Sequence, residues 1–279
     1  MTLSELVNNL EALPPAPEVL PKLVEIMQDP DTDANDVVSL IQTDPAIVAG
    51  VLRLSNSSVY APPSPVTDLT DAVSMLGIKE IYRIVNLVTS GEFLTGELAS
   101  MDIQKGSLWR HSLAVALIMD IIAADVTDLD GLPYTLGLLH DIGKLALHHG
   151  CGERYTNIFH KVETERISVS VAETATLGFD HAEAGAKMLE DWGFSESVYL
   201  PIRYQYDPHK AGEFKELAGA LQVANWGASV IGCNDGRDAW ALEMDPDVFH
   251  IDENNLEQAV LEGRFRLEKA LKAFEPGVN

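Results

Sequence analysis

Hydrophobic residues recur along this chain at the three- and four-residue spacing of amphipathic helices, and helix-capping signals separate the runs. Asp33 and Asp44 each stand directly before such a run, and Pro45 follows at the first helical position, where a missing N–H does no harm. Gly77 interrupts the next run, so we expect one helix to end there and another to begin at Ile78. No segment shows the sustained two-residue alternation of a strand between hairpin turns. The pattern therefore predicts an all-α fold.

The second half of the chain predicts further helices, and small and polar residues at 91–106 separate it from the first half. The expected helical segments are 107–126, 133–149, 153–179, 181–194, 214–232 and 254–274. The last of these is amphipathic, and we expect it to close the fold by packing with Leu256, Val260, Phe265, Leu267 and Leu271. We therefore expect an N-terminal helical subdomain, residues 1–95, packed on a second helical subdomain, residues 96–279.

Composition limits the location and the partners. With 279 residues and 46% hydrophobic residues, the chain can bury a sizeable core. The most apolar run, "LAVALIMDIIAA", is short and contains Asp120, and the N-terminus lacks the pattern of a signal peptide, so we expect no membrane segment. The two cysteines, Cys151 and Cys233, form no disulfide framework, which favours a cytoplasmic location. A net charge of −24 repels phosphate backbones, so we expect no nucleic-acid binding.

The stretch "LLHDIGKLALHHG" carries the candidate chemistry. A divalent metal in a hydrolytic site requires imidazole and carboxylate ligands on rigid elements. His111 on one predicted helix, His140 and Asp141 on the next, and His181 at the start of a later one supply these groups. Lys144 lies one turn after His140, where it could hold a phosphate oxygen or a carboxylate.

The same residues also allow a purely structural interpretation. Asp141 could accept a hydrogen bond or ion pair from His111 or Lys144, and His140 could donate to a backbone carbonyl. The sequence alone leaves both interpretations open.

Several stretches resemble the HDOD-domain family, a relative of the HD metal-dependent phosphohydrolases and of the HD-GYP phosphodiesterases. The similar segments are "VLRLSNS", "SMLGIKEI", "LWRHSLAVA", "LGLLHDIGKLAL" and "LGFDHAEAGAKMLEDWGF". The first two are typical of HDOD proteins, whereas "HDIGK" occurs across the wider HD superfamily. The similarity spans roughly residues 13–207. It implies an all-helical fold whose second subdomain is HD-like.

The resemblance also implies that His111, His140, Asp141 and His181 occupy metal-binding positions of catalytic HD relatives. Two positions depart from that pattern. The paired histidines of HD-GYP enzymes are replaced by Gln205 and Tyr206, and the last metal-binding Asp of HD enzymes is replaced by Asn225. The missing histidines disfavour a dinuclear phosphodiesterase. The neutral amide of Asn225 can still coordinate, but it weakens divalent binding.

We therefore expect a bacterial signal-transduction module that is regulatory and non-catalytic and that binds a partner protein or a small effector. The alternative is a mononuclear metal-dependent phosphohydrolase acting on a nucleotide or another phosphoester, with Lys144 offsetting phosphate charge. The metal would be Fe, Mn, Mg or Ni, if one is bound at all. A third possibility, binding of a cyclic dinucleotide without cleavage, rests on kinship alone.

Overall fold

Helices form nearly all of the regular structure in the computed structural model, which describes residues 2–8, 17–124, 126–127, 131–234 and 247–274. The first half holds α1 (Leu3–Asn8), α2 (Val19–Met27), α3 (Ala34–Ile41), α4 (Pro45–Ser55), α5 (Leu69–Leu76) and α6 (Ile78–Leu94). Within the described residues the extended structure is one isolated bridge, between Leu98 and Ile103. The predicted all-α fold is therefore confirmed.

The second half holds longer helices and three short 3₁₀ helices. They are η1 (Ala99–Met101), α7 (Ser107–Ile122), α8 (Leu132–Leu139), α9 (Gly143–Cys151), η2 (Gly152–Arg154), α10 (Tyr155–Glu165), α11 (Val169–Leu177), α12 (His181–Asp191), α13 (Glu196–Arg203), η3 (Pro208–Phe214), α14 (Lys215–Val230) and α15 (Glu253–Phe274).

Local signals determine the ends of the N-terminal helices. The Asp33 side chain accepts hydrogen bonds from the backbone N–H groups of Asn35 and Asp36, and the Asp36 side chain accepts one from the backbone N–H of Asp33. The Asp44 side chain caps α4 in the same way. Gly77 takes a φ of 81° between α5 and α6, a conformation that glycine adopts without steric strain. All of these boundaries were predicted from the sequence.

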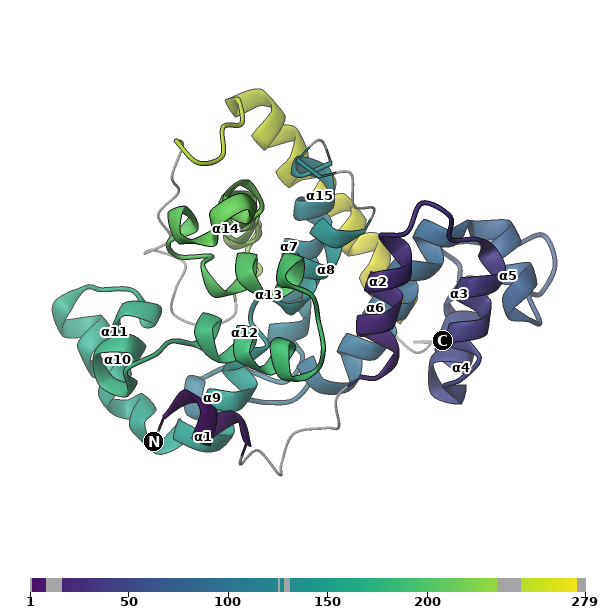
Figure 1. Ribbon diagram of the computed structural model, residues 1–279. Coiled ribbons are helices and arrows are strands. Elements are labelled where there is room, and N and C mark those ends of the chain that lie inside the picture. The colour runs from purple at the N-terminus through teal and green to yellow at the C-terminus, as the bar shows by residue number, and fades with distance from the viewer. Residues whose placement is uncertain (1, 9–16, 125, 128–130, 235–246, 275–279) are drawn as a thin grey trace.

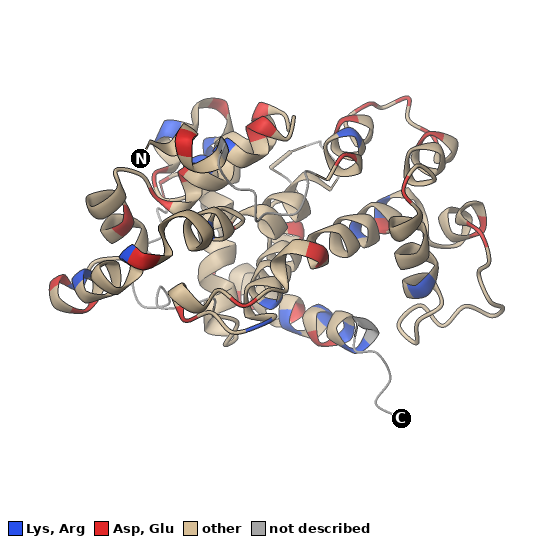
Figure 2. Ribbon diagram, turned by 90° about the horizontal axis from the view of Figure 1, so that it is seen from below, with Lys and Arg blue, Asp and Glu red and all other residues tan. Residues whose placement is uncertain are grey.

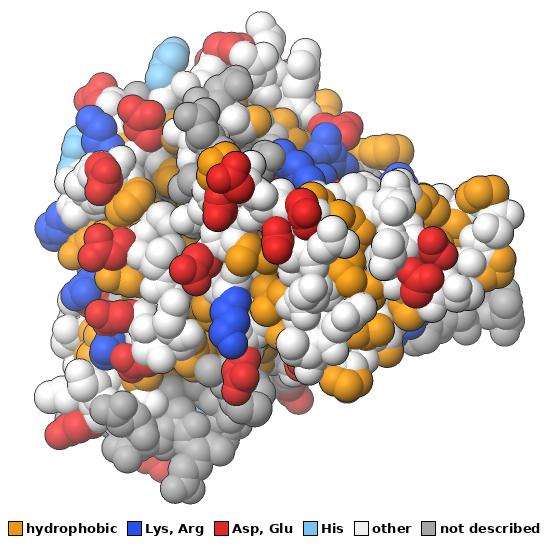
Figure 3. All heavy atoms as spheres, turned by 45° about the vertical axis from the view of Figure 1, so that its right-hand side comes forward, with side chains coloured by type: hydrophobic (Ala, Val, Ile, Leu, Met, Phe, Trp, Pro, Cys, Tyr) orange, Lys and Arg blue, Asp and Glu red, His pale blue; other side chains and the backbone are white. Residues whose placement is uncertain are grey.

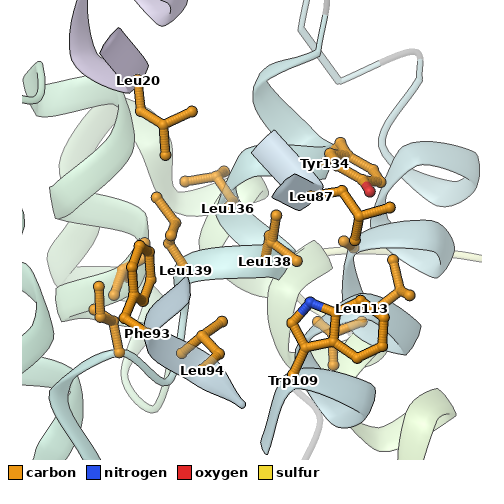
Figure 4. Packing of buried hydrophobic residues seen from close by; sticks show 14 of the residues in the cluster. Leu20, Leu87, Phe93, Leu94, Trp109, Leu113, Tyr134, Leu136, Leu138 and Leu139 are labelled. Carbon is orange, nitrogen blue, oxygen red and sulfur yellow. The ribbon is translucent and has the colours of Figure 1, made fainter. Parts of the chain in front are cut away.

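Helix α7 lies at the centre of the fold, packed against α8, α14 and α15 (Figure 1). Helices α2 to α6 form one side of the molecule, and α6 joins it to α7 and α8. Figure 4 shows how the core continues across this junction, with Leu20 of α2, Leu87 of α6 and Leu138 of α8 in one hydrophobic cluster. Burying a leucine side chain contributes roughly 1.5–3 kcal/mol, so this continuous core resists separation of the two halves.

The predicted and observed structures differ at several points, and the expected helical segment 153–179 forms two helices, α10 and α11. Helix α6 continues through Gly91 to Leu94, so the connection to α7 is shorter than the expected segment 91–106. Phe265 was expected to pack in the core, but its side chain is 64% exposed, whereas Val260 and Leu267 of the same helix are buried. The division into 1–95 and 96–279 stays a prediction, and α1 packs against α9 and α12 of the second half.

Acidic side chains are spread over the surface shown in Figure 3, with hydrophobic atoms exposed between them. This distribution accords with the net charge of −24. None of the described helices is long and apolar enough to cross a lipid bilayer.

Candidate functional site

A tight turn between α8 and α9 carries the His-Asp dipeptide. A single helix was predicted over 133–149, but α8 ends at Leu139 and α9 begins at Gly143. The connecting backbone makes three-residue hydrogen bonds, from Ile142 N to Leu139 O (3.1 Å) and from Lys144 N to Asp141 O (3.0 Å). Side chains three residues apart lie almost in line in such a turn. Lys144 therefore faces Asp141 rather than His140, which corrects the expectation from an unbroken helix.

Gly143 lets two helix backbones touch beside this turn. A Cβ atom at Gly143 would lie 1.9 Å from the carbonyl oxygen of His181 and 2.4 Å from the amide nitrogen of Gly185. Only glycine permits such an approach of α9 to α12. The contact brings the N-terminus of α12, and therefore His181, next to the turn.

The two histidines from α7 and α8 present their Nε2 atoms to each other at 3.2 Å. His111 Nδ1 lies 2.7 Å from the carbonyl oxygen of Cys233, and His140 Nδ1 lies 2.8 Å from that of Gly137. A carbonyl oxygen can only accept, so each Nδ1 carries its hydrogen, and Nε2 is the ring nitrogen that can donate an electron pair to a metal. Asp141 Oδ2 lies 3.2 Å from His140 Nε2 and 3.6 Å from His111 Nε2. The three side chains therefore converge as electron-pair donors.

This donor set fits one metal ion. Ligand atoms of His111, His140 and Asp141 all lie within 4.8 Å of one another, and all three residues are buried. Backbone carbonyls orient both imidazoles, as is usual for ligating histidines. The cluster could therefore hold a divalent metal, whose identity the donor set leaves open.

Two protein cations already surround the carboxylate of Asp141. Lys144 Nζ lies 2.9 Å from Oδ2, and His181 Nε2 lies 3.5 Å from Oδ1. Lys144 is itself buried, with 4% of its surface exposed. Its ammonium therefore neutralises Asp141 inside the protein, where an unpaired carboxylate would be strongly unfavourable.

Glu173 on α11 orients His181 and was not identified from the sequence. Its Oε2 lies 2.6 Å from His181 Nδ1 and accepts a hydrogen bond from the His181 backbone N–H at 2.9 Å. Tyr155 donates to the other carboxylate oxygen. Glu173 is fully buried, at the helical spacing of its apolar neighbours Val169 and Ala172. That spacing was the available signal, since a Glu on an apolar face requires a buried partner.

The charge on Glu173 changes the proton affinity of His181. Burial alone lowers the pKa of the imidazole, but Glu173, with a smaller contribution from Asp141, outweighs burial and raises the pKa to about 9. His181 is therefore protonated at neutral pH and donates hydrogen bonds from both ring nitrogens.

The positions that depart from the HD pattern have structural partners. Gln205 is buried and donates to the backbone carbonyl of His140 at 3.0 Å. The hydroxyl of Tyr206 lies 2.8 Å from His181 Nε2. Asn225 is buried on α14, and no hydrogen bond to the clustered side chains is described for it. The structure thus brings together His111, His140, Asp141, Lys144 and His181, and no hydrogen bond between their side chains and Asn225 is described.

Comparison with known proteins identifies the family to which this chain belongs. The HDOD domain profile matches residues 13–208. An uncharacterized protein from Treponema pallidum is 25% identical over 225 residues, covering 80% of this chain and 43% of the relative, so the chain spans less than half of that relative's length.

Two solved structures are similar over nearly their whole length. An HDOD domain protein of unknown function from Geobacter sulfurreducens has a TM-score of 0.75 at 22% identity, covering 98% of this chain and 97% of that one. A protein from Shewanella amazonensis, provisionally named a phosphohydrolase, has a TM-score of 0.73 at 24% identity, covering 97% of both chains. At these identities the similarity shows a shared fold. Because the domain profile covers residues 13–208, the chain belongs to the HDOD-domain family.

Proposed function

We propose that this HDOD chain is a regulatory module of signal transduction that binds a partner protein or a small effector and does not hydrolyse phosphoesters. The observation that carries the proposal is the buried ion pair between Lys144 Nζ and Asp141 Oδ2, at 2.9 Å. The ammonium of Lys144 neutralises the carboxylate of Asp141, which is the role that a bound metal cation would have at a catalytic site. The cluster then acts as a polar junction between α7, α8, α9 and α12.

Access supports the same conclusion. His111, His140, Asp141 and His181 are each at most 1% exposed. Four cavities among the described residues are lined by other side chains. A phosphoester substrate requires a concave opening onto the reacting groups.

A mononuclear phosphohydrolase is the second candidate, favoured by the convergence of His111, His140 and Asp141 within 4.8 Å. A divalent ion held by these three residues would polarise a phosphoryl group and lower the pKa of bound water. Lys144 would then leave Asp141 to offset phosphate charge, and Glu173 would keep His181 oriented toward the site. Under either candidate function we propose that the chain binds neither nucleic acids nor membranes.

One pair of measurements separates the two candidates. Metal content is measured by mass spectrometry on protein purified without a chelating tag. Hydrolysis of p-nitrophenyl phosphate and of its diester is then measured with added Mn²⁺, Mg²⁺, Fe²⁺ or Ni²⁺. The regulatory function predicts no turnover in wild type or in Asp141→Ala, whatever the metal content. Turnover by wild type that Asp141→Ala abolishes would overturn it.

A further inference from the structure

A cavity of about 440 Å³ lies where α4 and α6 meet α7, α8 and α15, and no residue of the Asp141 cluster lines it. Its wall is mostly apolar and includes Leu54, Ile84, Leu87, Leu113 and Leu117. Cavities of roughly 300–1,000 Å³ with apolar walls and a few polar groups are typical of small-molecule sites. Its helices come from both halves of the chain, so a ligand there would touch both.

Tyr134 of α8 contributes a polar atom to this apolar wall. Its side chain is 2% exposed and lines the cavity together with Leu87, on the same side of the core in Figure 4. Among the described residues its hydroxyl has no hydrogen-bond partner. Burial, together with the nearby charge of Glu80, raises the pKa of Tyr134, so the hydroxyl remains protonated. A buried donor of this kind gains a favourable interaction when a ligand supplies an acceptor.

Two of the cations at the cavity are neutralised by the protein. Arg83 pairs with Glu80 at 3.0 Å and with Asp120 at 2.5 Å. Arg266 of α15 lies 3.6 Å from the same carboxylate of Asp120. These pairs leave little charge for a ligand.

Lys269 differs from both arginines. It lies on α15 at the exposed rim of the cavity, and among the described residues it has no carboxylate partner. Along this part of α15 the charged residues are Arg264, Arg266, Glu268, Lys269 and Lys272. Figure 2 shows blue positions, with red between them, along the helix that leads to the C-terminus. Glu268 pairs with Arg264 at 3.3 Å and Glu262 pairs with Arg266 at 2.8 Å, so among the described cations that line the cavity Lys269 is the one left to attract an anion.

We propose that this cavity binds a small amphipathic anion, whose apolar body fills the leucine-lined space and whose single anionic head group pairs with Lys269 and accepts a hydrogen bond from the hydroxyl of Tyr134. The shared chemistry covers a carboxylate, a sulfonate or a phosphate on an apolar body. The role of this anion as an effector rests on the proposed regulatory function, whereas its binding does not.

A ligand in this cavity could affect the polar cluster through helices α6 and α8. Next to it, the hydroxyl of Tyr82 on α6 bonds to that of Thr135 on α8, and Thr135 donates to Asn86 at 3.1 Å. Helix α8 ends at Leu139, directly before His140 of the polar cluster. A ligand that tightens α6 against α8 therefore acts on the element that carries the cluster.

The test uses anilinonaphthalene sulfonate, a fluorescent apolar body with one anionic group, on the full chain. We expect saturable binding at one site per chain. Lys269→Glu should weaken binding by about tenfold or more, because it replaces an attraction by a repulsion. Lys272→Glu makes the same charge change three residues away, outside the cavity lining, and should weaken binding less than about twofold.

Two further variants test the interior. Tyr134→Phe removes the buried hydroxyl and should weaken binding by about threefold to tenfold, while it preserves the ring that packs the core. Ala270→Trp should fill the cavity and abolish binding, and its melting temperature shows whether it is folded. Displacement of the dye by decanoate, decanol and decylammonium should follow that order, with the anion strongest.

Equal affinity in wild type, Lys269→Glu and Tyr134→Phe would overturn the proposal, as would equal losses in Lys269→Glu and Lys272→Glu. Displacement by decylammonium as effective as that by decanoate would also overturn it. The result is independent of the proposed function: phosphoester turnover together with Lys269-dependent dye binding would refute the regulatory role and leave the anion site standing.

Discussion

Two aspartates of this protein each receive two cations, and their surroundings make the two sites very different. Asp141 contacts Lys144 and His181, and all of these side chains are at most 6% exposed. Asp120 contacts Arg83 and Arg266, whose side chains are 25% and 39% exposed. Similar groups at similar distances thus form a dry junction in one place and a solvated rim in the other.

The difference teaches that burial decides what such a network can do. Removing one partner from a buried pair leaves a charge without solvent, whereas removing the carboxylate of Asp120, 8% exposed, leaves arginines that water already reaches. The cluster around Asp141 is therefore suited to hold helices in one arrangement. The ion pairs around Asp120, beside a cavity, can rearrange when a ligand enters.

The largest expected effect comes from Gly143→Ala, which tests how closely the helices around Asp141 are packed. The new Cβ atom would meet the backbone of His181 at 1.9 Å, and neither backbone can move aside cheaply. We expect a loss of at least about 4 kcal/mol in the free energy of unfolding, or no folded protein. Urea denaturation measures it, and a loss below about 1 kcal/mol would contradict the close contact of α9 and α12.

Asp141→Ala compared with Asp120→Ala tests the two networks directly. We expect about 3 kcal/mol or more of destabilisation for Asp141→Ala, because Lys144 and His181 would stay buried without their shared carboxylate. Asp120→Ala should lose about 1 kcal/mol, since its arginines reach solvent. Denaturation in metal-free buffer measures both free energies of unfolding. Equal losses would contradict the conclusion that burial makes the network around Asp141 the more important of the two for stability.

Glu173→Gln tests the electrostatics around His181 through pH. The pKa of His181 rises from 6.5 to about 9 on folding, so its stabilisation is present below the unfolded value and is lost as pH rises through about 9. In chelator-treated protein the free energy of unfolding should therefore fall between about pH 7 and pH 9. Glu173→Gln should reduce that slope and destabilise the protein by about 2 kcal/mol at neutral pH. An unchanged slope would show that Glu173 does not control this proton.

Gly91→Ala gives the smallest expected effect, with the opposite sign. Gly91 lies inside α6, and a Cβ there would make only an ordinary contact, 3.7 Å from the indole nitrogen of Trp109. The substitution should stabilise the protein by about 0.5–1 kcal/mol, because alanine loses less backbone freedom in a helix. Thermal or urea unfolding measures the gain. A destabilisation would contradict the ordinary contact expected between a Cβ atom at Gly91 and Trp109.

Features determined by neighbours in the sequence were predictable. The caps at Asp33 and Asp44, the helix boundary at Gly77 and the all-α class depend on side chains within a few residues of the backbone they stabilise. The grouping of His111, His140 and Asp141 was also expected, from the donor chemistry and from resemblance to the HDOD family.

Tertiary structure decided the remaining details, because they depend on groups distant in the chain. The break after His140 goes with the contact of Gly143 against α12, and it turns Lys144 toward Asp141. The role of Glu173 depends on its contact with His181, which lies eight residues away in the sequence. An amphipathic pattern also cannot show whether Phe265 lies at a cavity rim or in the core. The sequence by itself determined the helices and the chemical groups available. Packing determined which charges share one buried space, since burial and distance set their energies.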